Sequence, residues 1–198
     1  MADRLFVSCL LVLLISGCAF SRTPSQTART ATEQLLLSQA IERSLHDLSV
    51  PLPEGSTVVI ETAGFAVPPT AFIPSDLNYA RDTVAGRLGQ LGFRIHPKNE
   101  ESRYIVRVLV QSLGTVQGET FLGMPPVQSV IVPIALPELT LYKAQRQSGY
   151  MRYSIDIYEA ATGRFIRSTP WYTGTSYYNQ YTVLFLFKYN STDLLLPP

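Results

Sequence analysis

The chain is poor in the side chains that most often carry chemistry. Among its 198 residues there are two cysteines, two histidines and one tryptophan. His46 and His96 are not at metal-ligand spacing, so we expect no metal site. The motifs of serine hydrolases, zinc proteases and phosphate-binding loops are also missing. We therefore expect a protein without enzymatic activity and without a bound cofactor.

A surplus of charge of either sign is lacking as well. Lys and Arg total 16 and Asp and Glu total 15, which leaves a net charge of +1. Because there is no basic surplus, nothing indicates a nucleic-acid partner. The hydrophobic content of 46% is enough for a folded core. Beyond the N-terminal region, no apolar run approaches the roughly 20 residues that a membrane-spanning helix needs.

The N-terminal apolar run, Leu5–Ile15, is too short to span a bilayer and fits the apolar region of a signal peptide. Ile-Ser-Gly then directly precedes Cys18. This order resembles the bacterial lipobox, in which an aliphatic residue and two small residues precede a cysteine. The resemblance implies that residues 1–17 are a leader that is removed, and that Cys18 receives a diacylglycerol and an N-acyl chain as a membrane anchor. The alternative is an ordinary signal peptide with an incidental cysteine.

Loss of this leader would also remove Cys9, so that Cys18 is the only cysteine left and no intramolecular disulfide can form. Ala19, rather than Asp, follows Cys18. By resemblance to enterobacterial sorting rules, this favours the outer membrane, with the protein facing the periplasm. Residues 18–29 are rich in Ser, Thr and Arg and are typical of a tether, and residues 30–198 suit a single domain.

The pattern of that domain alternates between helix and strand. Thr30–Leu48 begins with a capping-box sequence and continues with apolar residues at helical spacing. Ser75–Gly92 is a second amphipathic helix, with Gly92 just past its end. We expect an α/β fold, more closely an α+β sandwich, with a mixed sheet of about five strands and two main helices on one face. The expected strands are Ser56–Glu61, residues 93–97, Arg103–Gly114 and a hairpin within residues 149–174.

Thr120–Tyr142 is an apolar segment of unusual composition for a surface loop. It carries no charge as far as Pro137 and contains four prolines, which disfavour helix and interior strand. It could fold back over the sheet, form a protein–protein surface or touch a membrane, and a large exposed apolar patch would favour the last two. The candidate interaction residues in this segment are Phe121, Met124, Val130, Ile131, Ile134 and Leu136.

The C-terminal segment 171–198 is rich in aromatic residues around the apolar run Thr182–Phe187. Tyr and Trp are common at interfaces because one end is apolar and the other can form hydrogen bonds. The run could be a final core strand, or it could pair with another chain if it is left uncovered. The candidate interaction residues here are Trp171, Tyr177, Tyr178, Tyr181, Phe185 and Phe187.

Several short motifs resemble a family of uncharacterised bacterial lipoproteins. They are Thr30–Ala40, Tyr104-Ile105-Val106, Pro137-Glu138-Leu139 with Leu141-Tyr142-Lys143, and Thr162-Gly163-Arg164. A more distant resemblance, carried by Leu88–Ile95, is to the α/β domain of curli-secretion and flagellar outer-membrane lipoproteins. This second resemblance implies a ring-forming or scaffold lipoprotein of the envelope.

The leading hypothesis is a structural or assembly component of an envelope complex, anchored to the inner leaflet of the outer membrane. It would bind copies of itself or a larger protein complex through the two apolar segments. One alternative is a monomeric periplasmic carrier or sensor that holds an apolar small molecule beneath the 120–142 segment. Another is an envelope hydrolase whose residues follow none of the familiar motifs.

Overall fold

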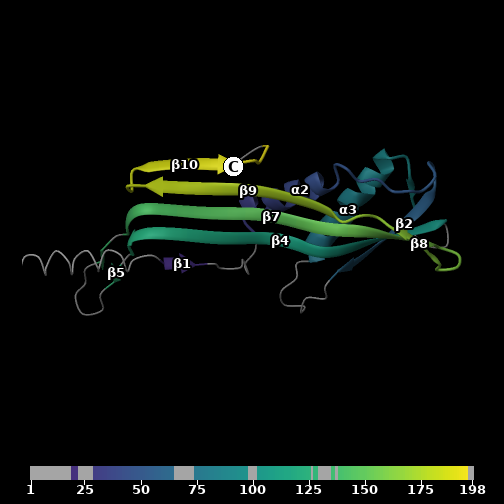
Figure 1. Ribbon diagram of the computed structural model, residues 1–198, viewed down its shortest axis with the longest axis horizontal. Helices are drawn as coiled ribbons and strands as arrows, with labels where there is room; N and C mark the ends of the chain where they lie inside the picture. The colour runs from purple at the N-terminus through teal and green to yellow at the C-terminus, as the bar shows by residue number, and fades with distance from the viewer. Residues whose placement is uncertain are drawn as a thin grey trace, which may run out of the picture. The chain divides into compact units, whose positions relative to one another are not determined.

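The computed structural model describes residues 19–21, 29–64, 74–97, 102–125, 127–128, 135–136 and 138–195. Cys18 and most of the predicted tether lie outside these residues. Figure 1 shows the helices and strands along the chain. They are β1 (Ala19–Ser21), α2 (Ala31–Ser44), β2 (Thr57–Gly64), α3 (Pro74–Gln90), β3 (Arg94–Ile95), β4 (Tyr104–Met124), β5 (Val127–Gln128), β6 (Ala135–Leu136), β7 (Leu139–Glu159), β8 (Phe165–Ser168), β9 (Tyr172–Val183) and β10 (Phe187–Thr192).

The main sheet of the described residues is mixed. Strand β2 pairs in parallel with β3 and β4, whereas β10 with β9, β8 with β7, and β1 with β4 are antiparallel. The sheet contains eight strands, of which six follow the order β10-β9-β7-β4-β2-β3. The mixed sheet with two helices is therefore confirmed, but the prediction of about five strands was too low. The two C-terminal strands and the short β1 lack the Gly or Asn turn signals that would mark them in the sequence.

Both helices begin and end where local chemistry favours it. At the start of α2, the Thr30 side chain accepts a hydrogen bond from the Glu33 amide, and the Glu33 carboxylate accepts one from the Thr30 amide at 2.8 Å. This is the predicted capping box, which satisfies amides that a helix start leaves unpaired. Helix α3 lies within two residues of its predicted bounds, and Gly92 after its end has a φ of +89°.

The chain divides into two compact units, which we name by their contents. The helix unit comprises Gln26–Thr115, Ser148–Tyr177 and Leu194–Pro198. The hairpin unit comprises Met1–Ser25, Val116–Gln147 and Tyr178–Asp193. Strands β4, β7 and β9 contribute residues to both units.

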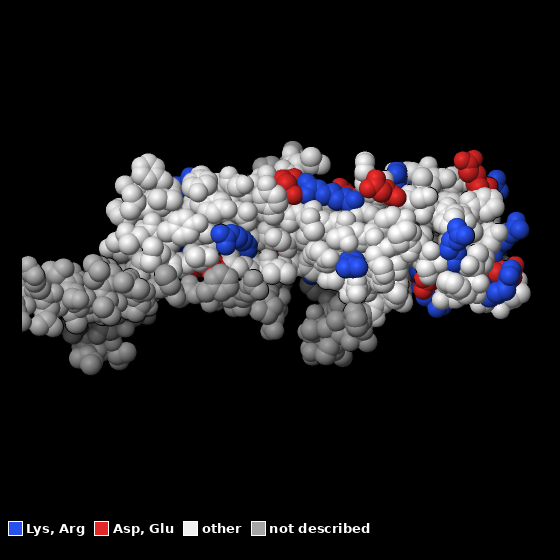
Figure 2. Space-filling model, viewed as in Figure 1, with Lys and Arg blue, Asp and Glu red and all other residues white. Residues whose placement is uncertain are grey.

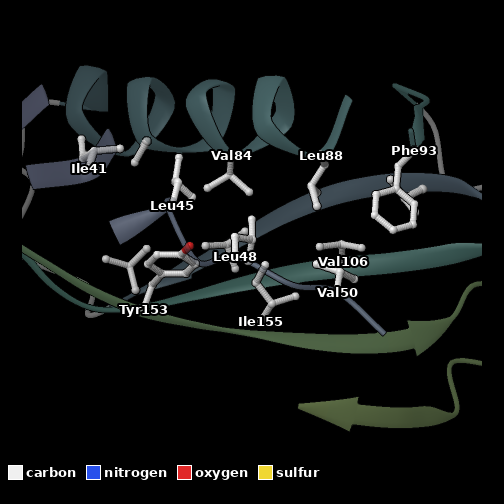
Figure 3. Close-up of a cluster of buried hydrophobic side chains, with 14 of the residues drawn as sticks. Ile41, Leu45, Leu48, Val50, Val84, Leu88, Phe93, Val106, Tyr153 and Ile155 are labelled. Atoms are coloured by element: carbon white, nitrogen blue, oxygen red, sulfur yellow. The ribbon is translucent and has the colours of Figure 1, made fainter. Parts of the chain in front are cut away.

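The hydrophobic core lies in the helix unit, where both helices contribute to it. Figure 3 shows Ile41 and Leu45 of α2 and Val84 and Leu88 of α3 facing the sheet. Side chains at alternate positions of β4 and β7 complete the cluster, because successive residues of a strand point to opposite faces. These strand residues are Tyr104, Val106, Val108, Val110, Met151, Tyr153, Ile155 and Ile157, all buried.

Helix α2 approaches the sheet closely over two glycines. A methyl group on Gly149 of β7 would overlap the carbonyl oxygen of Leu36, and one on Gly174 of β9 would overlap that of Ala40. The hydroxyl of Ser176, two residues along β9, donates a 2.6 Å hydrogen bond to the same Leu36 oxygen. The two glycines therefore set how near the helix backbone lies to β7 and β9.

The predicted loop 120–142 is wrong at both ends. Strand β4 continues ten residues beyond the predicted strand end at Gly114 and reaches Met124, and β7 already begins at Leu139. Between them the structure describes the antiparallel pair β5 and β6. Because the ends of the segment pair with neighbouring strands, its uncharged residues there are sheet residues and not loop residues. The predicted hairpin within residues 149–174 is confirmed by the pairing of β7 with β8.

Candidate interaction surface

A β-hairpin, formed by β9 and β10, is the main feature of the hairpin unit. Its register pairs Tyr181 with Tyr189 and Val183 with Phe187, so Leu184–Leu186 form the connecting turn. The interpretation of Thr182–Phe187 as a single core strand is therefore wrong. The run contains only residues that favour strands and has no turn signal, yet its backbone reverses at Leu184.

The tip of this hairpin, Leu184–Phe187, is apolar and exposed to solvent. The exposed fractions are 50% for Leu184, 57% for Phe185, 69% for Leu186 and 64% for Phe187. Four consecutive large apolar residues with this exposure are unusual on the surface of a folded protein, where apolar side chains are normally scattered. The tip is thus a strong candidate for contact with another molecule.

The backbone of the tip is strained, and neighbouring groups hold it in place. Leu184 and Phe185 have φ values of 48° and 47°, in the left-handed region that residues with a side chain rarely adopt. The Leu184 amide donates to the carbonyl oxygen of Leu141 at 2.8 Å, and the Phe185 amide donates to that of Thr140 at 2.9 Å. The Leu186 amide donates to the carbonyl oxygen of Leu184. The amides of all three turn residues therefore have protein acceptors.

The strands beside the tip add further apolar side chains. Leu139 and Leu141 of β7 are exposed, as are Leu122 and Met124 of β4. The two strands are neighbours in the sheet, and Gly123 lies against the backbone of Leu139 and Leu141. In this way the tip, the start of β7 and the end of β4 form one apolar region within the hairpin unit.

Charged groups lie next to this region on β4 and β7. The Lys143 ammonium is 3.3 Å from the Glu138 carboxylate, 3.5 Å from that of Glu119, and 5.8 Å from the centre of the Phe121 ring. The hydroxyl of Thr140 donates to the Glu138 carboxylate at 2.7 Å. That hydrogen bond, and then Lys143, lower the pKa of Glu138 below its usual value. The group is therefore ionised at neutral pH and gives the apolar region a polar margin.

The candidate residues of the 120–142 segment are placed only in part. Phe121 is half-buried in β4, and Met124 is exposed at its end. Leu136 lies in β6 and pairs with Val127. The remaining three candidates, Val130, Ile131 and Ile134, lie outside the described residues, as does Cys18.

The aromatic candidates separate into two groups. In the hairpin unit, Tyr181 stacks on Tyr189 with ring centres 4.8 Å apart, near the exposed Phe185 and Phe187. Trp171 and Tyr177 are exposed in the helix unit, where Arg152 lies over the Trp171 ring.

Tyr178 was included among the candidates but is buried, with 6% of its surface exposed. Its hydroxyl accepts a hydrogen bond from the Gln180 side chain at 3.2 Å. Because its ring is packed inside the protein, Tyr178 is not part of the exposed surface.

Sequence reasoning missed four of the exposed leucines. Leu184 and Leu186 form the tip together with Phe185, and Leu139 and Leu141 lie beside it in β7. Their apolar character alone did not distinguish them from core residues. The one available signal was the uncharged run Thr182–Phe187, since an interior strand of that composition requires covering elements on both faces.

Chemically reactive arrangements are scarce in the described part of the chain. No group of three or more His, Cys, Asp or Glu residues there could hold a metal ion. The exposed His46 has Asp47 as its carboxylate neighbour, 4.0 Å away. A recess of about 60 Å³ is lined by polar side chains of β4 and β7 and suits water better than an apolar ligand. None of the helices described is sufficiently long and apolar to cross a membrane.

Comparisons with known proteins give weak structural likenesses. No family model and no curated protein matches the chain. Three solved structures are similar. They are the PelC dodecamer from Paraburkholderia phytofirmans (15% identity, 80% of each chain, TM-score 0.31), a putative neuraminyllactose-binding hemagglutinin homolog from Helicobacter pylori (13%, 63% of this chain and 68% of that one, 0.30) and the LpoB C-terminal domain from Salmonella enterica (11%, 71% and 94%, 0.28). At these TM-scores the likenesses carry no functional argument.

Proposed function

We propose that the chain is an outer-membrane lipoprotein and a non-catalytic structural component of an envelope complex, built by association of its own copies. The location rests on the lipobox that ends at Cys18. The association rests on one observation, the edge strand β10. Among the described strands, β10 has one neighbour, β9, and lies at the end of the sheet order.

Strand β10 has the properties of a strand that pairs with another chain. Its residues from Phe187 to Ser191 are all exposed, and a free edge offers unpaired amides and carbonyls to an incoming strand. Soluble proteins usually protect such edges with charges, proline or bulges. Here Lys188 is the single charge, no proline occurs, and the register with β9 is regular over six pairs.

A lipid anchor would favour this association. Anchored copies diffuse in a plane, so their effective concentration is higher than that of the same number of copies in free solution. A weak strand-to-strand contact can then be occupied. When the contact uses different surfaces on the two copies, repetition closes into a ring or continues as a filament.

Two neighbouring substitutions test the role of the edge. Asn190→Pro and Ser191→Pro each remove one amide, and because amides alternate along a strand, one of the two faces β9 and the other faces outward. The variant that keeps the parent's thermal midpoint has lost the outward amide. We expect this variant to be monomeric in mild detergent, while the unaltered protein forms a discrete oligomer. An unchanged oligomer in both variants would rule out β10 as the contact.

A further inference from the structure

The exposed tip Leu184–Phe187 is separate from the edge strand in its chemistry. An edge strand binds through its backbone, but the three turn amides of the tip already donate to carbonyl oxygens of Leu141, Thr140 and Leu184. The tip therefore offers side chains and few backbone donors. This composition suits an apolar medium, in which every unpaired backbone group costs several kcal/mol.

The backbone conformation also indicates that the apolar side chains serve a purpose. Glycine and asparagine adopt positive φ values easily, and they are the usual residues of tight hairpin turns. Leu184 and Phe185 occupy these positions instead, at φ values of 48° and 47°. Strain of this kind commonly persists where the side chain has a function.

The tip lies in the same unit as the attachment point of the predicted lipid. Ala19, which is covalently bonded to Cys18, pairs with Phe121 of β4. Two residues further along β4, Gly123 contacts Leu141, whose carbonyl oxygen accepts from the tip amide of Leu184. Neighbouring strands are about 5 Å apart, so these successive contacts place the tip and the chain's exit from the lipid at one end of the hairpin unit.

The residues behind the tip are those found at the headgroup level of membranes. Tyr181 and Tyr189 stack on each other in the hairpin, and Lys188 precedes Tyr189. Tyrosine places its ring among apolar groups and its hydroxyl in water, and a lysine stem can extend its charge outward to the headgroups. Figure 2 shows a surface that is almost free of charged side chains over the hairpin of β9 and β10.

We propose that Leu184–Phe187 inserts into a phospholipid monolayer beside the acyl chains of Cys18, so that the protein is held at two points. The inference extends the proposed function, because it rests on the lipid anchor at Cys18. An acyl anchor alone leaves a protein free to rotate on its tether, whereas a second apolar contact fixes the orientation of the hairpin unit toward the membrane. Strand β10 would then be presented at a constant height above the lipid surface.

A fluorescence measurement on the full-length protein extracted from membranes tests the proposal. In a Trp171→Phe background, Phe185→Trp places the sole tryptophan at the tip, and Val116→Trp places it at a position of β4 that is 59% exposed. Both proteins are reconstituted into vesicles of phosphatidylethanolamine and phosphatidylglycerol that contain brominated acyl chains. Phe187→Trp gives the same readout from regular strand geometry if the turn variant does not fold.

We expect the tip tryptophan to emit at shorter wavelength in vesicles and to be quenched by the brominated chains at least about threefold more strongly than tryptophan 116. Quenching no stronger than that of tryptophan 116 would overturn the proposal, as would a short-wavelength emission that bromine does not reduce, since that result means burial against another copy. Intact mass reports the acyl chains and native mass reports the oligomer in the same samples. Failure of the lipid insertion is thereby distinguished from failure of the proposed function.

Discussion

The backbone of Gly174 in β9 lies directly against the carbonyl oxygen of Ala40 in helix α2, with no room for a methyl group between them. We expect Gly174→Ala to lower the free energy of unfolding by about 3 kcal/mol or to prevent folding, because strand and helix must separate to admit the Cβ atom. Chemical denaturation measures the change. Gly89→Ala on α3 is the control: its Cβ would meet open space, and removal of a helical glycine raises stability by about 0.5–1 kcal/mol.

The strained turn at Leu184 and Phe185 gives a second prediction. The double variant Leu184→Asn, Phe185→Gly introduces residues that accept a positive φ, so we expect the free energy of unfolding to increase by about 1 kcal/mol. Leu186 does not have a positive φ, and Leu186→Asn should bring no such gain. Equal effects of the two changes on the urea midpoint would contradict the turn geometry.

The N-terminus of α2 depends on the reciprocal hydrogen bonds between Thr30 and Glu33. Thr30→Ala leaves the Glu33 amide without its side-chain acceptor, and we expect a loss of about 1 kcal/mol in the free energy of unfolding. Thr30→Ser retains the acceptor oxygen and should remain within a few tenths of a kcal/mol of the parent. If serine and alanine had the same effect, the capping box would have no role in stability.

Burial of Tyr153 predicts a loss of stability at alkaline pH. Its hydroxyl donates to the carbonyl oxygen of Ser44, and burial in the core raises the pKa of the phenol above its ordinary value of 10.0. Above that pH the unfolded chain releases a proton that the folded chain retains, so the free energy of unfolding falls as the pH rises. Below about pH 9 this group contributes no slope.

Tyr153→Phe isolates this effect from the other tyrosines. The variant lacks the titrating group, so its stability should decline less steeply than the parent's above about pH 10. The difference between the two free energies of unfolding should be constant at neutral pH. Parallel curves through the alkaline range would mean that Tyr153 ionises equally in both states.

The sequence predicted those parts of the fold that local chemistry determines. The capping box at Thr30 and the glycine at position 92 marked the two helices within a few residues. The length of β4 was not predictable, because residues from Thr115 to Met124 are strand only through pairing with distant partners.

The candidate surface was predicted by segment but not by conformation. Phe185 and Phe187 were identified from their apolar surroundings, whereas Leu184 was not, because its exposure depends on the chain reversal. No Gly or Asn marks that reversal, which is held by hydrogen bonds to Thr140 and Leu141, more than 40 residues earlier in the chain. Contacts of this range are not visible in a local sequence pattern.

The native mass of the unaltered protein, extracted from membranes in mild detergent, tests the central claim most directly. If copies associate through β10, the mass corresponds to a discrete oligomer that persists on dilution in detergent. If the protein is a monomer under these conditions and in unextracted membranes after chemical cross-linking, association through the edge strand is wrong. The apolar tip would then have to be explained by contact with lipid alone.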